Sequence, residues 1–330
     1  MRTFDLHSDT MIDIGLRRIQ GETDVIAKHH LDDYQKGDMG GMIYALWTPI
    51  DMEILEEFHI PKVAENAQDL MMQLMAHTFR ELDDTECAEI GYTADDLEQI
   101  ADSGKTAILL GFEGFYGFNG EVNTIDTIYH AGFRHGMLTW NDDNEFATGS
   151  DSSFTDHDTG LTDRGVAIVK RMEELGMLID VSHTSEQTFW DIMENTTGPI
   201  IASHSNAWTL CNCTRNLKDD QIKAIAERGG VIGMNSWRGF IKEDNSEVPA
   251  NEHDLARHAR YIADLVGPEH VACGFDFCNY LTPEDVLHGL ETAAETPAFL
   301  DALRGVGFSE DEIKGIAWEN PMRVFRQVLK

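Results

Sequence analysis

The sequence feature that most constrains the fold is a short pattern that occurs twice, an apolar run followed directly by Ser-His. Residues 178–181 (Leu-Ile-Asp-Val) lead through a serine into His183, and residues 199–202 (Pro-Ile-Ile-Ala) lead through a serine into His204. Short β-branched runs bounded by glycine or proline predict buried strands, and a helix-like segment of about a dozen residues between them predicts a βαβ unit. We therefore expect two parallel neighbouring strands with a histidine at the carboxyl end of each, where α/β folds place their functional residues.

Apolar runs of this kind alternate with helical segments along all 330 residues, and no shift in composition divides the chain. The predicted strands cover residues 3–6, 42–47, 106–112, 133–139, 178–181, 199–202, 231–234 and 270–274. Helical periodicity is clearest over residues 62–82 and 161–175. This order predicts one (β/α)₈ barrel domain of TIM type over residues 1–330, with extended βα loops at residues 15–38 and 142–160. A doubly wound open sheet is the alternative architecture.

The net charge indicates which binding partners to exclude, and the cysteine content indicates which cellular compartment to expect. A formal net charge of −34 argues against nucleic acids and anionic membranes as partners, since both require basic patches. No apolar run is long enough to span a membrane, and the N-terminal residues lack the pattern of a signal peptide. Five cysteines, an odd number without framework spacing, indicate a reducing compartment. We expect a soluble, cytoplasmic protein.

Side chains able to bind a metal or transfer a proton lie just after predicted strands. They are His7, Asp9, Glu113, His183, His204 and Asp276. His7 and Asp9 are two positions apart, so an extended strand would point both to one side. Imidazoles and carboxylates together suit Zn²⁺, with Mn²⁺ or Co²⁺ as substitutes. Six such groups exceed the needs of one zinc ion, and two ions sharing Glu113 are the simplest explanation.

Each of these residues also has a structural explanation when it is taken alone. Asp276, for example, could cap a helix, and the whole set could be hydrogen-bonded polar residues of a barrel that binds no metal. Other catalytic signatures are absent from the sequence: there is no Gly-x-Ser-x-Gly elbow, no His-Glu-x-x-His helix and no Walker loop.

The chain resembles the membrane dipeptidase (renal dipeptidase) family of metallopeptidases, within the amidohydrolase-like barrels, over nearly its whole length. The matching stretches are Asp5-Leu6-His7-Ser8-Asp9, Gly111-Phe112-Glu113-Gly114, Leu178-Ile179-Asp180-Val181-Ser182-His183, Ile201-Ala202-Ser203-His204-Ser205-Asn206-Ala207, Thr214-Arg215-Asn216, His270-Val271-Ala272-Cys273-Gly274-Phe275-Asp276-Phe277 and Asn320-Pro321-Met322-Arg323-Val324-Phe325.

The resemblance implies a zinc-dependent dipeptidase with two Zn²⁺ ions per chain and a metal-activated bridging hydroxide. It assigns the metal ligands as His7, Asp9 and Glu113 for one ion and Glu113, His183 and His204 for the other. Asp276 matches an acid that transfers protons, and Arg215 matches the residue that binds the terminal carboxylate of the substrate. The resemblance also implies tolerance of a C-terminal D-residue and a homodimer.

The sequence departs from the family pattern beside the predicted substrate. Trp140 follows Leu-Thr where family members often have a histidine, and Phe275 and Cys278 replace smaller or acidic residues. Because Trp140 cannot change charge, a related hydrolase of N-acyl amino acids, lactones or other small amides is an alternative function. A metal-binding protein without turnover is a second alternative, although it would need neither Arg215 nor Asp276.

Overall fold

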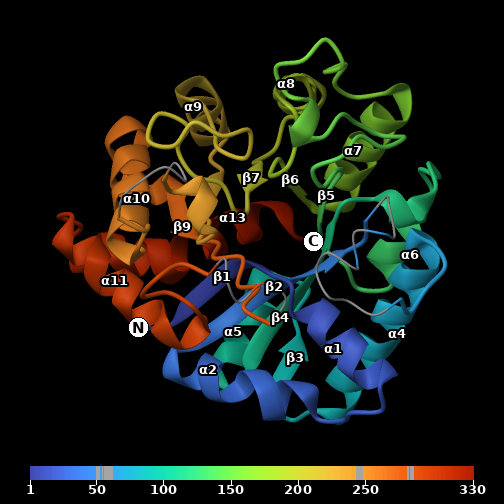
Figure 1. Ribbon diagram of the computed structural model, residues 1–330, viewed down its shortest axis with the longest axis horizontal. Helices are drawn as coiled ribbons and strands as arrows, with labels where there is room; N and C mark the ends of the chain where they lie inside the picture. The colour runs from blue at the N-terminus through green and yellow to red at the C-terminus, as the bar shows by residue number, and fades with distance from the viewer. Residues whose placement is uncertain (50–52, 54, 56–61, 243–247, 281, 283–285) are drawn as a thin grey trace.

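The computed structural model describes residues 1–49, 53, 55, 62–242, 248–280, 282 and 286–330. Its centre is a closed barrel of eight parallel strands surrounded by helices (Figure 1). The barrel strands are β1 (Thr3–Ser8), β2 (Met39–Trp47), β4 (Thr106–Glu113), β5 (His135–Met137), β6 (Leu178–Asp180), β7 (Ile201–Ala202), β8 (Val231–Met234) and β9 (Val271–Cys273). Pairing of β1 with both β2 and β9, and of β2 with β4, closes the ring. The predicted TIM-type (β/α)₈ barrel is confirmed, and the open-sheet alternative is wrong.

One short strand was not predicted. β3 (Ala88–Ile90) pairs in parallel with the first residues of β4, beginning with Ala88 opposite Thr106. The later residues of β4 pair with β5 on the same edge, so β3 lies outside the closed ring. A run of three residues, Ala-Glu-Ile, is too short to show the alternation that identifies a strand in sequence.

Helices follow most of the barrel strands and surround the barrel. They are α1 (Thr10–Ile19), α2 (Leu31–Lys36), α4 (Ala67–Asp84), α5 (Ala94–Asp102), α6 (Thr124–His130), α7 (Asp163–Leu175), α8 (Glu186–Asn195), α9 (Asp219–Glu227), α10 (Glu252–Val266), α11 (Thr296–Gly305), α12 (Glu310–Lys314) and α13 (Asn320–Val328). The predicted helices over residues 62–82 and 161–175 correspond to α4 and α7. Gly176 ends α7 in the left-handed conformation, at φ 76°, which a residue without a Cβ adopts at little cost.

The prediction of a long loop over residues 15–38 is wrong. Most of this segment is helical, in α1, a π-helical turn at Ile26–His30 and α2. One tertiary and one local contact explain why its many charged residues did not prevent helix formation: the His30 ring lies 2.9 Å from Asp13 Oδ2, and within α1 the Arg17 Nε–H donates to the same carboxylate. The loop predicted over residues 142–160 is confirmed, with one 3₁₀ turn at Ser150–Ser152.

The barrel interior is apolar at its amino-terminal end. Phe4 and Leu6 of β1 belong to a buried cluster that includes residues of the neighbouring strands and of α13. The Phe4 ring contacts Phe325 of α13 edge to face, with centroids 5.1 Å apart. This end of the barrel is filled with apolar side chains, and the polar residues described below lie at the opposite end, where the strands terminate.

Among the described residues, no helix combines the length and apolar character needed to cross a membrane.

Candidate metal centre and active site

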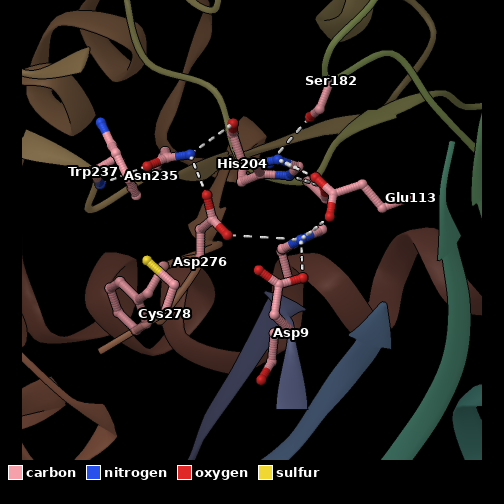
Figure 2. Close-up of polar contacts among 12 residues, drawn as sticks. Asp9, Glu113, Ser182, His204, Asn235, Trp237, Asp276 and Cys278 are labelled. Atoms are coloured by element: carbon pink, nitrogen blue, oxygen red, sulfur yellow. Dashed lines mark hydrogen bonds and ion pairs between the residues drawn. The ribbon is translucent and has the colours of Figure 1, made fainter. Parts of the chain in front are cut away.

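The polar side chains predicted from the sequence meet at the carboxyl ends of the barrel strands (Figure 2). His7 Nε2 lies 3.4 Å from Glu113 Oε2, 3.6 Å from Asp9 Oδ1 and 3.8 Å from Asp276 Oδ1. All four residues are buried or nearly so, although they come from three different strand ends. One imidazole therefore faces three carboxylates at the mouth of the barrel.

The other oxygen of Glu113 faces the Ser-His pair. Glu113 Oε1 lies 2.9 Å from His183 Nε2 and 3.5 Å from His204 Nε2. The two histidine Nε2 atoms lie 2.9 Å apart, and β6 and β7 are parallel neighbours as expected. The two oxygens of one carboxylate thus face different imidazoles, Oε2 facing His7 and Oε1 facing His183 and His204.

Two overlapping sets of three residues have all their ligand atoms within 4.8 Å of one another. One is His7, Glu113 and His204, and the other is His7, Asp9 and Asp276. Geometry alone would therefore admit Asp276 as a metal ligand, whereas the sequence resemblance gives it a role in proton transfer.

A bulge in β1 brings His7 into the mouth. Leu6 belongs to the barrel interior, so strict alternation would point His7 to the opposite face of the sheet. Asp5 pairs with Met42 and Ser8 pairs with Tyr44, so that three steps along β1 face two steps along β2. The extra residue re-aims the side chains that follow, as bulges near functional sites commonly do.

His183 and Asp276 both have backbone angles that are uncommon for residues with a side chain. Their φ values are 64° and 61°, in the left-handed region. This conformation costs free energy and persists where surrounding contacts enforce it, most often at functional sites. Each residue is the third after the end of a short strand, β6 for His183 and β9 for Asp276.

Two buried carboxylates, which the sequence analysis did not single out, hold these strand ends together. Asp5 Oδ1 accepts hydrogen bonds from the backbone N–H groups of His7 and Phe275, at 3.2 and 2.8 Å. Asp180 Oδ1 accepts from those of Ser182 and Ser203, at 2.9 and 3.0 Å. Each carboxylate therefore joins two neighbouring strand ends next to site residues. The available signal was an aspartate inside an apolar strand, two or three residues before a histidine.

Replacement of Asp180 by asparagine is expected to lower the free energy of unfolding by about 3 kcal/mol, because it removes a buried charge-assisted hydrogen bond. Asp180 Oδ2 lies 2.8 Å from His135 Nε2, and both residues are fully buried. His135 and the two backbone donors hold the pKa of Asp180 below its ordinary value despite its burial. Because the pKa of Asp180 is lower in the folded than in the unfolded protein, its carboxylate increases the free energy of unfolding at pH values above the unfolded-state pKa. This contribution is lost as the pH falls through the folded-state pKa.

Denaturant unfolding at several pH values checks this prediction. The difference between wild type and the Asp180→Asn variant should be largest near neutral pH and should narrow below about pH 4, the ordinary range of an aspartate pKa. Asp32→Asn, at an exposed ion pair with Lys36 on α2, serves as a control that should behave like wild type. Equal unfolding midpoints for all three proteins would contradict the importance of the His135–Asp180 contact.

Burial shifts the pKa values of the site residues in opposite directions. It raises the pKa of Glu113 to about 8 and that of Asp276 to about 6, in each case against the opposing effect of His7. Burial lowers the pKa of His183 and His204 well below the ordinary histidine value, with further lowering from Arg215 and His7. Both imidazoles are therefore neutral at pH 7 and can offer a nitrogen lone pair to a metal ion.

The surroundings of the imidazoles fit metal binding. Asn141 Oδ1, which can only accept, lies 2.8 Å from His183 Nδ1 and therefore fixes the hydrogen of His183 on that nitrogen. Ser203 Oγ lies 2.7 Å from His204 Nδ1 in a similar position. Neither ring nitrogen of His7 has a hydrogen-bond partner among the described residues, and neither has Asp9 Oδ1. Convergent ligand atoms without partners are what an ion in this mouth would satisfy.

The two predicted substrate-binding residues lie in different cavities. Trp140 lines a cavity of about 250 Å³ that opens onto Asp9, Glu113 and Asp276. Arg215 is buried and lines a smaller cavity of about 20 Å³. Its Nη2–H donates to the carbonyl of His204 at 3.3 Å, and its Nε has no partner among the described residues. Sequence reasoning from residue types alone would have placed Arg215 on the surface; only the resemblance indicated its place beside the site.

Comparison with known proteins agrees with the resemblance seen in the sequence. The model of the family described as membrane dipeptidase (peptidase family M19) matches residues 1–330. A Klebsiella pneumoniae protein from the region 5′ of pqqA is 34% identical over 265 residues, which cover 78% of this chain and 93% of that protein. An uncharacterised dipeptidase of Schizosaccharomyces pombe is 32% identical over 262 residues, which cover 78% of this chain and 61% of that protein.

Solved structures share the fold. A metallo peptidase from Rhodobacter sphaeroides, bound to a phosphinate mimic of the dipeptide L-Ala-D-Ala, superposes with a TM-score of 0.86 at 22% identity, covering 99% of both chains. The probable dipeptidase PvdM from Pseudomonas aeruginosa gives a TM-score of 0.85 at 19% identity, covering 99% of this chain and 95% of that one.

Proposed function

We propose that this chain hydrolyses dipeptides with two zinc ions held at the mouth of its barrel. The proposal starts from the fact that the chain belongs to the membrane dipeptidase family, peptidase family M19. Family membership makes the chain a metallopeptidase that cleaves the peptide bond of dipeptides. The identity of the ion, the number of ions and the role of each residue are our proposal. The observation that supports it best is the position of Glu113, whose two oxygens face different imidazoles, those of His7 and His183.

We assign His7, Asp9 and Glu113 to one zinc ion, and Glu113, His183 and His204 to the other. Imidazole nitrogens and carboxylate oxygens are preferred zinc ligands, and each ion would keep a position for water or substrate. When bound, the zinc pair would supply a bridging hydroxide nucleophile near neutral pH and polarise the substrate carbonyl.

Asp276 transfers a proton to the leaving amine in this proposal. Asn235 Nδ2–H donates to Asp276 Oδ2 at 3.1 Å, and the same amide group donates to the carbonyl of His204 at 3.3 Å (Figure 2). This contact fixes one carboxyl oxygen and leaves Oδ1 directed to the ligand cluster. Its position suits a group that accepts a proton as the nucleophile attacks and returns it to the departing nitrogen.

Arg215 binds the free C-terminal carboxylate of the substrate in this proposal. Its guanidinium lies over the Phe240 ring, 5.4 Å from the centroid, in a setting where a planar fork of donors pairs well with a carboxylate. Binding of a terminal carboxylate so near the metal ligands leaves room for one residue beyond the scissile bond. It therefore favours dipeptides over longer chains.

The Arg215→Ala variant is expected to raise KM for dipeptides by about 100-fold, the usual effect of leaving a buried carboxylate without its partner. Arg215→Lys should recover part of the loss, because an ammonium keeps the charge without the bidentate geometry. Kinetics with a dipeptide and the corresponding dipeptide amide provide the check. Wild type should discriminate strongly between them and Arg215→Ala should not; an unchanged KM in the alanine variant would show that the carboxylate binds elsewhere.

Hydrolysis of a small panel tests the proposed function directly. L-Ala-L-Ala, L-Ala-D-Ala and N-acetyl-L-Ala are compared before chelation, after chelation and after return of zinc. Cleavage of the dipeptides that is lost on chelation and restored by zinc supports the proposal. Cleavage of N-acetyl-L-Ala alone would favour the alternative hydrolase, whose supporting observation is Trp140 beside His183, with ring centroids 6.0 Å apart. Full metal loading without cleavage of any amide would favour a metal-binding protein without turnover.

Three further parts of the proposal concern substrate stereochemistry, assembly and location. Tolerance of a C-terminal D-residue and a homodimer rest on the family resemblance, and the Rhodobacter sphaeroides protein bound to a mimic of L-Ala-D-Ala supports the former. A cytoplasmic location rests on the five cysteines, all of them among the described residues and none in a disulfide bond. Light scattering of the purified protein would test the dimer.

A further inference from the structure

Four large aromatic side chains line the larger cavity at the mouth. Trp47 and Trp140 contact each other edge to face, with ring centroids 5.3 Å apart and planes inclined by 68°. Trp237 and Phe240 form a second pair, with centroids 6.2 Å apart and planes inclined by 31°. Aromatic rings prefer edge-to-face or offset contacts with other rings, so these walls complement an aromatic ligand.

The four aromatic residues come from three separate parts of the chain. Trp47 ends β2, Trp140 follows β5, and Trp237 and Phe240 follow β8. Figure 2 shows Trp237 on the opposite side of Asp276 from Glu113. Trp237 therefore extends the cavity away from Glu113, whereas Trp140 lies beside His183, with ring centroids 6.0 Å apart.

The size of this cavity suits one aromatic residue. An apolar cavity of about 150 Å³ is large enough to bind benzene. The cavity of about 250 Å³ also contains the space beside Asp9, Glu113 and His183 that the zinc ions would occupy, so one aromatic side chain is the largest group that fits in the remainder. The cavity beside Arg215, of about 20 Å³, has room for little more than the oxygens of a carboxylate.

Charge sets the direction in which a dipeptide would lie. Arg215 is the one lysine or arginine among the described residues that line either cavity, and His183 lines both of them. In the aromatic cavity, Asp9 and Glu113 are assigned to zinc, so Asp276 is the carboxylate left to face an ammonium group, whereas Glu186 in the Arg215 cavity is paired with Lys218. A zwitterionic dipeptide would thus place its carboxylate at Arg215 and its ammonium in the aromatic cavity, with the peptide bond beside His183.

We infer that the enzyme selects dipeptides with a large aromatic residue at the N-terminal position and a small residue at the C-terminal position, and that Trp237 is a specificity-determining residue. The inference depends on the proposed function, because it uses Arg215 as the carboxylate site. Trp237 suits the test because its side chain is half-buried and its contact with Asn235 is made by its backbone N–H, which a substitution retains.

The experiment compares Phe-Ala with Ala-Phe, two substrates of the same composition, on zinc-loaded full-length enzyme. We expect kcat/KM for Phe-Ala to exceed that for Ala-Phe by at least about tenfold, since even one methylene group in an apolar pocket is worth about 10- to 200-fold. Ala-Ala serves as the reference substrate. In the Trp237→Ala variant, the ratio of kcat/KM for Phe-Ala to that for Ala-Ala should fall by about tenfold.

Trp190→Ala is the matched control, since Trp190 is a half-buried tryptophan on α8 that lines neither cavity. Its Phe-Ala to Ala-Ala ratio should equal that of wild type. Cleavage of none of the three dipeptides would reject the proposed function itself. Equal cleavage of Phe-Ala and Ala-Phe, or a preference for Ala-Phe, would reject the inferred selectivity and leave the dipeptidase function intact. A preference that persists unchanged in Trp237→Ala would reject the role of Trp237.

Discussion

Replacement of Glu113 by glutamine is expected to lower kcat/KM for dipeptides by at least about 10³-fold, the scale on which electrostatic stabilisation of a transition state acts. The two oxygens of Glu113 face different imidazoles, at 3.4 Å from His7 Nε2 and 2.9 Å from His183 Nε2. Glutamine has nearly the same shape but no charge and a single acceptor oxygen, so it cannot hold two cations together. The bound metal should therefore fall below two ions per chain.

Metal analysis and kinetics on the same preparations check this prediction. Glu121→Gln is a suitable control, because Glu121 is exposed and follows the same strand a few residues later. It should keep the metal content and the activity of wild type. A Glu113→Gln variant that retained both would show that Glu113 does not bridge the ions.

The Asp276→Asn variant is expected to lower kcat by about 10²- to 10⁴-fold, the usual contribution of general acid–base catalysis. Asparagine can still accept the hydrogen bond from Asn235 but cannot transfer a proton. KM should change little, because Asp276 is not assigned to bind the ground state of the substrate. The metal content should stay at that of wild type.

Metal content decides between the two possible roles of Asp276. Its Oδ1 lies 3.8 Å from His7 Nε2, and it belongs with His7 and Asp9 to a set that could hold an ion. Loss of one ion per chain in Asp276→Asn would make it a ligand and would contradict its role as a proton carrier. The same measurement on Asn235→Ala, which removes the donor to Asp276 Oδ2, should show full metal content with reduced kcat.

The sequence was sufficient for the barrel and for its most prominent residues. Each predicted barrel strand is present, because its apolar run was bounded by glycine, proline or a change to polar residues. The repeated Ser-His pattern placed His183 and His204 at neighbouring strand ends, and the structure brings their Nε2 atoms to 2.9 Å. Parallel strands explain this success, since their carboxyl ends meet at one edge of the sheet.

Tertiary contacts determine the features that the sequence analysis missed. The bulge in β1 that re-aims His7 depends on pairing with β2, and no local pattern records it. The contacts of Asp5 with Phe275 and of Asp180 with Ser203 join residues far apart in the chain. The helical state of residues 15–38 depends partly on the contact of Asp13 with His30, which no local spacing reveals, whereas Asp13 and Arg17 form an i,i+4 pair that the sequence does contain.

The central claim is that two zinc ions share Glu113 at the mouth of this barrel. The measurement that tests it most directly is anomalous diffraction at the zinc absorption edge, from crystals of protein purified without chelators. We predict two peaks, one beside His7 and Asp9 and one beside His183 and His204, with Glu113 between them. A single peak, or peaks remote from Glu113, would contradict the claim.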